Sequence, residues 1–181
     1  MAGENYEVRP FHSAAQYEAM IDYFLLADDV FLRGMGVERN KLPRRDTWLR
    51  DVLADHERPD DKKERLYLAW IYKGEQAGHS SINKIRMREE AYFHLHLWRP
   101  DLRKAGLGTE FSKRCVNFYF ERFQLKRLFC EPFAENPGPN KVLPKLGFKF
   151  IQRYVTVPGP LNGEQEVNRY VLAVETVHDG I

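Results

Sequence analysis

Cysteine is scarce in this chain, with only Cys115 and Cys130 among 181 residues. Their spacing fits neither a disulfide framework nor a zinc-binding set of paired cysteines, which excludes a small fold held together by disulfides or by a structural zinc ion. Each lies in an apolar stretch, so we expect two buried thiols. This cysteine usage is typical of a reducing compartment, and we expect a cytoplasmic protein.

The sequence also has no long apolar run and no excess of one charge. A membrane-spanning helix needs about 20 apolar residues, and neither such a run nor a signal-peptide pattern is present, so we expect no membrane association. Lys and Arg number 28 against 26 Asp and Glu, a net charge of +2 that gives no general affinity for nucleic acid. Apolar residues make up 43% of the chain, which predicts one folded domain over residues 1–181.

Hydrophobic periodicity predicts strands alternating with helices. A capping box at Ser13 and Gln16 marks the start of the first helix, and the stretch 26–42 is too irregular for one element. Strands are predicted over 6–11, 66–72, 78–87, 91–98, 127–133, 148–156 and 168–174, and further helices over 46–55, from Gly106 and after Asn136.

The most informative motif is Arg103-Lys104-Ala105-Gly106-Leu107-Gly108, which lies between a predicted strand and a predicted helix. Two glycines that open a helix present bare backbone N–H groups and the positive end of the helix dipole to an anion. The motif therefore predicts a pyrophosphate site. It lacks the third glycine of a dinucleotide-binding fingerprint, where Phe111 stands, and the Gly-Lys-Ser/Thr of a Walker loop.

The form Arg-x-x-Gly-x-Gly resembles motif A of the GNAT superfamily of acyl-CoA N-acyltransferases, which holds the pyrophosphate of coenzyme A. A second block, residues 129–148, is similar to motif B of that superfamily. In it Asn136 opens a helix, and Gly147 ends the helix eleven residues later. The two motifs cover residues 91–148, in the order and at the spacing of the superfamily.

The resemblance implies an α/β GNAT fold, in which a mixed and mostly antiparallel sheet carries helices on both faces. Two central parallel strands, 91–98 and 127–133, are expected to splay apart and to receive the pantetheine arm of acetyl-CoA or another acyl-CoA as co-substrate. The implied cofactor-binding residues are Leu97, Trp98, Arg103, Lys104, Ala105, Gly106, Leu107, Gly108, Thr109, Asn136 and Asn140.

Acyl transfer to an amine benefits from a general base, and histidine titrates in the useful range. His94 and His96 share one face of their strand because strand side chains alternate. They are candidates for catalysis, with a hydrogen-bonded structural pair as the alternative; a metal pair would need a third ligand, and none stands at recognisable spacing. Glu131, on the neighbouring strand, either orients a histidine or binds a substrate ammonium, or else forms a salt bridge.

A narrower resemblance is to the siderophore-type branch of the superfamily, which includes the mycobactin and aerobactin acyltransferases. The residues that match this branch are His94, which the resemblance implies is the base, Glu131, which stands in place of the usual Asp as its partner, and Asn136. The acid-Pro-x-x-x-Asn pattern also occurs in aminoglycoside 6'-acetyltransferases. Leu143 stands where many superfamily members have a tyrosine as general acid, and a thiol with a pKa near 8.5 leaves without that acid.

We therefore expect transfer of an acetyl or other short acyl group to the amine or hydroxylamine nitrogen of a small molecule, in the manner of siderophore biosynthesis. The alternatives are an aminoglycoside-type acetyltransferase, a protein N-terminal acetyltransferase and a non-catalytic acyl-CoA-binding sensor. Segments 31–42 and 157–163 are expected to border the acceptor pocket, and a homodimer is compatible with the fold.

Overall fold

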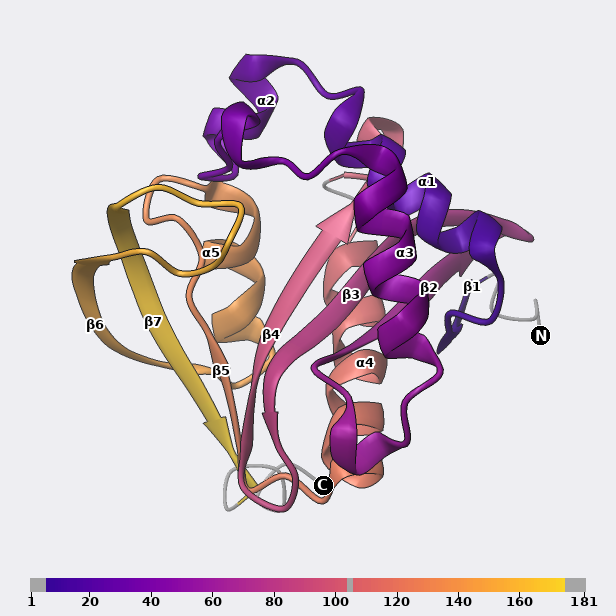
Figure 1. Ribbon diagram of the computed structural model, residues 1–181. Helices are drawn as coiled ribbons and strands as arrows, with labels where there is room; N and C mark the ends of the chain where they lie inside the picture. The colour runs from indigo at the N-terminus through magenta and orange to yellow at the C-terminus, as the bar shows by residue number, and fades with distance from the viewer. Residues whose placement is uncertain (1–5, 104–105, 175–181) are drawn as a thin grey trace.

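A computed structural model describes residues 6–103 and 106–174, and in them a seven-stranded sheet has the order β1-β2-β3-β4-β5-β7-β6 (Figure 1). Strands β4 and β5 are parallel, and the other neighbouring strands are antiparallel. The expected mixed, mostly antiparallel sheet is confirmed. The strands are β1 (Tyr6–Pro10), β2 (Arg65–Tyr72), β3 (Glu75–Arg86), β4 (Glu90–Leu97), β5 (Arg127–Cys130), β6 (Lys149–Thr156) and β7 (Gln165–Ala173).

Helices cover both faces of this sheet (Figure 1). Alternate residues of β2 explain why, since Leu68 and Trp70 belong to the core under α4, whereas Ala69 and Ile71 belong to the core under α1 and α3. The Trp70 ring stacks on Phe111 of α4 at 5.2 Å between centroids. The helices are α1 (Ala14–Leu25), α2 (Asp29–Gly34), α3 (Arg45–His56), α4 (Leu107–Phe123) and α5 (Pro137–Lys145).

The central parallel strands separate soon after they meet. Residues Glu90–Tyr92 of β4 pair with Arg127–Phe129 of β5, and there the pairing ends. Beyond Cys130 the chain follows β7, because the Pro132 carbonyl accepts a hydrogen bond from the Asn168 N–H at 3.1 Å. Proline has no N–H to extend a ladder on its other side. The expected splayed pair is confirmed, and β5 is shorter than the predicted 127–133.

Two local expectations need revision. Ser13 does precede α1, but within the described residues its side chain makes no capping hydrogen bond. The Gln16 side chain accepts a hydrogen bond from the N–H of His12, the residue before the N-cap, at 2.8 Å, so the expected capping box is replaced by this neighbouring contact. The stretch 26–42 is more ordered than predicted, since it holds α2 and a single 3₁₀ turn at Arg39–Lys41.

Candidate active site

The glycine motif forms the start of α4 as predicted. Gly106 is the N-cap residue and has a φ of 79°, a left-handed conformation that suits glycine. Among the described residues no heavy atom lies within 4 Å of a Cβ added at Gly106 or Gly108, so the approach to the helix start is open. The first N–H groups of an α-helix have no i−4 carbonyl partner within it, which leaves donors at the start of α4 that an anion can use. Lys104 and Ala105, two of the expected phosphate-site residues, lie outside the described residues.

Arg103 connects this helix start to the end of β4. Its guanidinium lies over the Phe31 ring of α2 at 5.1 Å, and its Nη2 donates to the Leu97 carbonyl at 3.5 Å. The Arg103 side chain is exposed, so its charge remains accessible to an anion at the start of α4. Leu107 and Thr109 belong to the first turn of α4, where the Thr109 N–H donates to the Gly106 carbonyl at 3.0 Å.

The backbone of β4 has one paired edge and one open edge. The Trp98 N–H donates to the Ala77 carbonyl at 2.9 Å, which places Trp98 in the set of residues whose backbone groups point to β3. In an antiparallel ladder these residues alternate with residues that point the other way. Leu95 and Leu97 therefore direct their N–H and C=O groups to the edge that β5 has left. Trp98, one of the implied cofactor-binding residues, has its backbone N–H engaged by β3, so that donor is not available to the pantetheine arm.

Three histidines lie on one face of β3 and β4, where His79 is paired with His96. The two rings stack at 4.7 Å between centroids. Burial, followed by the nearby His94, lowers the pKa of His96 to about 3. The Nδ1 of His79 accepts a hydrogen bond from the Trp98 indole at 2.8 Å, and burial also holds the pKa of His79 well below its usual value. His96 thus belongs to a packed aromatic cluster, which fits the structural alternative.

His94 has a different environment. It is half-buried, and its Nε2 is shielded from solvent without a hydrogen-bond partner in the described part of the chain. Burial, followed by the charge of Lys84, lowers the pKa of the His94 imidazole to about 4. The ring is therefore neutral at pH 7 and offers a nitrogen that can bind a proton or a donor. An unsatisfied buried polar atom costs about 1–3 kcal/mol, and a bound substrate that hydrogen-bonds to it would remove that cost.

Glu131 is not placed as the sequence predicts. Its carboxylate accepts a hydrogen bond from the Tyr154 hydroxyl and lies 3.4 Å from Nη1 of Arg169. Nη2 of Arg169 in turn donates to the Tyr92 hydroxyl at 3.1 Å. No hydrogen bond joins Glu131 to His94 among the described residues. The salt-bridge alternative is therefore correct in this structure, because β6 and β7 supply partners that sequence spacing does not reveal.

The two asparagines of the motif B region shape the loop between β5 and α5. Asn136 is the N-cap of α5, and its side chain accepts a hydrogen bond from the Gly138 N–H at 3.2 Å. The Asn140 amide donates to the carbonyls of Phe133 and Asn136 and accepts from Tyr170. Asn140 is thus held by contacts within the protein, which give it a structural role besides the expected cofactor contact.

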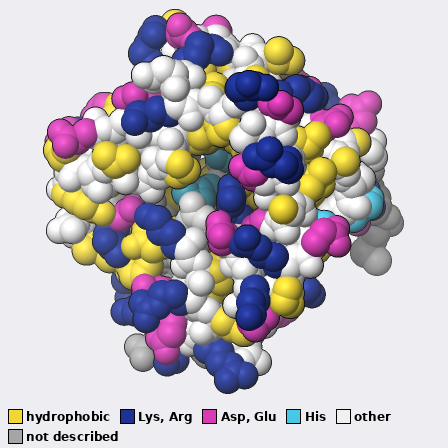
Figure 2. Space-filling view, viewed as in Figure 1, with side chains coloured by type: hydrophobic (Ala, Val, Ile, Leu, Met, Phe, Trp, Pro, Cys, Tyr) yellow, Lys and Arg dark blue, Asp and Glu magenta, His cyan; other side chains and the backbone are white. Residues whose placement is uncertain are grey.

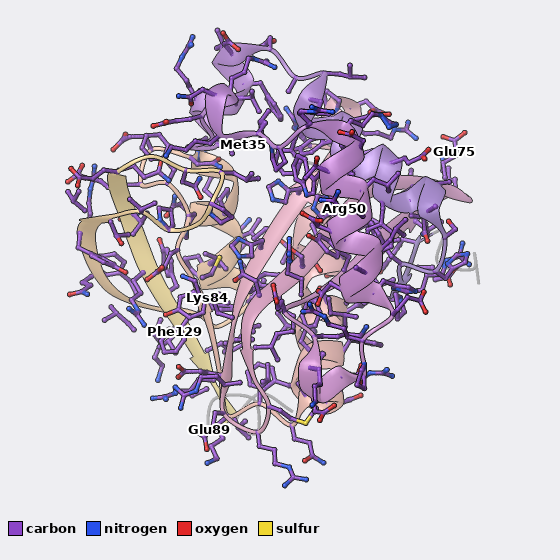
Figure 3. The ribbon with its side chains drawn as sticks, viewed as in Figure 1. Met35, Arg50, Glu75, Lys84, Glu89 and Phe129 are labelled. Carbon is purple, nitrogen blue, oxygen red and sulfur yellow. The ribbon has the colours of Figure 1, made fainter. Side chains whose placement is uncertain are left out.

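A hollow lies over the upper part of β4, and histidine atoms form part of its floor with Lys or Arg side chains beside it (Figure 2). Figure 3 shows Lys84 and Phe129 on the side of β4 that faces β5 and β7, with Met35 under α2. A separate cavity of about 330 Å³ lies at α2, between Leu32, Val37 and Arg39.

Three further expectations concern the rest of the chain. Both cysteines are buried thiols, as expected, and burial raises the pKa of Cys115 to about 12. Within residues 6–103 and 106–174, no three His, Cys, Asp or Glu side chains are arranged to hold a metal ion. No helix in the same residues is long and apolar enough to cross a membrane.

Comparison with known families gives a match over residues 7–149 to the family described as Acetyltransferase (GNAT) domain. The comparison with curated proteins finds no match.

Solved structures with the same fold include a ribosomal L7/L12 alpha-N-protein acetyltransferase in complex with coenzyme A, at a TM-score of 0.76 and 16% identity, covering 97% of this chain and 98% of that one. The ribosomal-protein-S5-alanine acetyltransferase from Vibrio fischeri has a TM-score of 0.75 and 17% identity, with 96% and 95% covered. The spermidine N-acetyltransferase from Vibrio cholerae, in complex with coenzyme A and spermine, has a TM-score of 0.74 and 15% identity, with 95% and 97% covered.

Proposed function

Because the chain belongs to the GNAT acetyltransferase family, we propose that it transfers an acetyl or other short acyl group from acyl-CoA to the amine or hydroxylamine nitrogen of a small molecule. One observation carries the proposal. The open edge of β4 leads from the glycine-opened start of α4 to the strand segment that carries His94. A phosphate site, an extended backbone edge and a neutral imidazole are thus aligned along one strand.

The residues at this edge fit acetyl-CoA. The first turn of α4 and the guanidinium of Arg103 suit a pyrophosphate, because a helix N-terminus and a cation both stabilise negative charge. The backbone groups of Leu95 and Leu97 suit the amides of the pantetheine arm. Bound acetyl-CoA supplies the acyl group as a thioester. We propose Arg103, Gly106 and Gly108, with the first-turn N–H groups of α4, as the phosphate site.

His94 serves as the general base in this proposal. A neutral imidazole accepts the proton that the acceptor nitrogen loses as the C–N bond forms and the C–S bond breaks. A pKa of about 4 makes His94 a weak base, which suits an acceptor nitrogen of low proton affinity, such as a hydroxylamine. Leu143 is fully buried and provides no acid for the thiolate, so the thiolate takes its proton from solvent.

The proposed acceptor class is the small amines and N-hydroxyamines that the siderophore-type resemblance implies. The test compares kcat/KM with acetyl-CoA for N-hydroxylysine, lysine, spermidine, kanamycin and a peptide with a free N-terminus, measured as free thiol release. We expect the N-hydroxyamine to react fastest.

A preference for kanamycin by more than about tenfold, ~1.4 kcal/mol in transition-state stabilisation, would reject this acceptor class. Preference for the peptide would identify a protein N-terminal acetyltransferase. Coenzyme A binding without thiol release on the whole panel would identify a sensor.

A further inference from the structure

Lys84 occupies an unusual backbone position in the irregular part of β3. The pairing of β3 with β4 is irregular between Asn83 and Arg86, and within this irregularity Lys84 has a φ of 49°. A residue with a side chain rarely adopts this left-handed conformation. Irregularities of this kind re-aim a side chain and are frequent beside active sites. Here the Lys84 side chain departs from the regular alternation of β3, and its ammonium reaches the ring of Tyr92 on β4.

The Lys84 ammonium lies among residues of the candidate site. Its Nζ is 4.5 Å from the centroid of the Tyr92 ring and donates to the Pro158 carbonyl at 3.3 Å. Tyr92 is two residues from His94 on the same face of β4. The charge of Lys84 also acts directly on the His94 imidazole, where it opposes protonation. Figure 3 places Lys84 beside β4, on the side toward β5 and β7.

The charge of Lys84 is not neutralised by a neighbouring acid. The other cation at Tyr92 is Arg169, and Glu131 is its ion-pair partner. No carboxylate of the described residues forms an ion pair with Lys84. The Lys84 ammonium beside Tyr92 and His94 is therefore a positive charge with no carboxylate partner among the described residues, and it attracts an anionic group.

We propose that the acceptor carries a carboxylate a few bonds from its nucleophilic nitrogen, and that Lys84 binds this carboxylate. The inference rests on the proposed function and narrows its substrate class to amino-acid-like amines. A polyamine or an aminoglycoside would instead bring a second ammonium against Lys84. Lys84 is thus a specificity-determining residue, and His94 remains the residue that handles the proton.

The experiment uses lysine, lysinamide and cadaverine, which carry two amines on the same five-carbon chain and differ in the group beside one of them: a carboxylate, a neutral amide or hydrogen. For the wild type we expect kcat/KM to be at least about tenfold higher with lysine than with lysinamide, and lowest with cadaverine. K84Q removes the charge and keeps a polar side chain that is one atom shorter, so the ratio of lysine to lysinamide should fall to about one. K84E should reverse the order and favour cadaverine.

Lys73 offers a matched control. It also has a left-handed backbone, with a φ of 52°, and its Nζ lies 5.2 Å from the ring centroid of Tyr72. It stands at the β2–β3 turn, two residues before Glu75, and Figure 3 shows Glu75 on the other side of the molecule from Lys84. K73Q should therefore retain the wild-type ratio of lysine to lysinamide.

An unchanged ratio in K84Q, or a wild type that acylates all three amines equally, would overturn the carboxylate site and leave acyl transfer intact. If no amine releases thiol, the three compounds are titrated calorimetrically into the protein with coenzyme A. Lysine binding that weakens in K84Q and not in K73Q would then support the carboxylate site and reject acyl transfer to these amines. No binding of any of the three compounds would reject both the carboxylate site and the proposed acceptor class.

Discussion

His94 and His96 are two residues apart on one strand face, and their surroundings assign them different tasks. The His96 ring is enclosed by the rings of His79, Phe24 and Tyr23. The Nε2 of His94 is buried and has no partner among the described residues. Packing, rather than strand position, thus selects His94 as the candidate base.

Replacement of His94 by Ala should lower kcat by roughly 10²–10⁴-fold, the usual contribution of a general base. Affinity for coenzyme A should stay within about twofold, because the proposed phosphate site lies at α4. Steady-state kinetics and calorimetry measure the two quantities. The control is His96→Leu, which should lose stability more than kcat. A His94→Ala enzyme of normal kcat beside a crippled but folded His96→Leu enzyme would reverse the assignment.

The buried histidines should also make the stability of the protein depend on pH. Burial lowers the pKa of His94 to about 4 and of His96 to about 3, against 6.5 for the exposed side chain. The unfolded chain then binds more protons than the folded one, so stability is complete above pH 6.5 and falls as the pH drops toward the folded pKa values.

At pH 5 each of these histidines should lower the free energy of unfolding by about 2 kcal/mol relative to pH 7.5. Urea denaturation at the two pH values measures the difference in the free energy of unfolding. The His96→Leu variant should lack the contribution of His96, about 2 kcal/mol. Equal dependence on pH in the wild type and in His96→Leu would show that His96 does not titrate in this way.

Single residues were predictable where local spacing sets their role. Alternation along β4 placed His94 and His96 on one face, as the pairing with β3 has it, and the glycine pattern located the start of α4. The partners of Glu131 could not be predicted, because Arg169 and Tyr154 come from strands later in the chain and no sequence spacing links them to Glu131. Lys84 was missed because a pleat irregularity, which leaves no clear mark in the sequence, turns it toward the site.

The proposed phosphate site at the start of α4 depends on the lack of a side chain at Gly108. Gly108→Asp adds a side chain and a negative charge where the described structure leaves the approach open, so coenzyme A affinity should fall at least about 100-fold. The control is Asn117→Asp, which adds the same charge at an exposed position farther along α4. Calorimetry compares the two, with circular dichroism as the check on folding. Equal affinities in both variants would refute a phosphate site at this helix start.

The boundaries of elements were predictable where glycine or a regular period marks them, and less so where tertiary contacts decide. Gly106 marks the start of α4, as expected. Strand β5 ends at Cys130, before the predicted limit, and beyond it the contact with β7 continues as the bond from the Asn168 N–H to the Pro132 carbonyl and as a bridge between Phe133 and Val167. The helix α2 escaped notice because six residues are too few for a periodic pattern.

At the scale of the whole molecule, a ligand that binds only the folded state should raise the melting temperature by mass action. Coenzyme A at about 100 times its dissociation constant adds about 2.7 kcal/mol of stability, which corresponds to roughly 5–10 °C in a protein of this size. Differential scanning fluorimetry measures the shift. Asn117→Asp should show the wild-type shift and Gly108→Asp little or none, and a full shift in Gly108→Asp would place the ligand elsewhere.

The short junction between β4 and β5 has a consequence for ligand binding. Three residue pairs join the half of the sheet that holds β1–β4 to the half that holds β5–β7, so a ligand inserted beyond this junction would add hydrogen bonds to the open edge of β4. Amide hydrogen exchange should reveal it, because the N–H groups of Leu95 and Leu97 face the opening and that of Trp98 is bonded to Ala77. We expect fast exchange at the two leucines, slow exchange at Trp98, and protection of the leucines once coenzyme A is added. Binding would thus order this edge of the sheet, and the loss of conformational entropy would lower the observed affinity for coenzyme A.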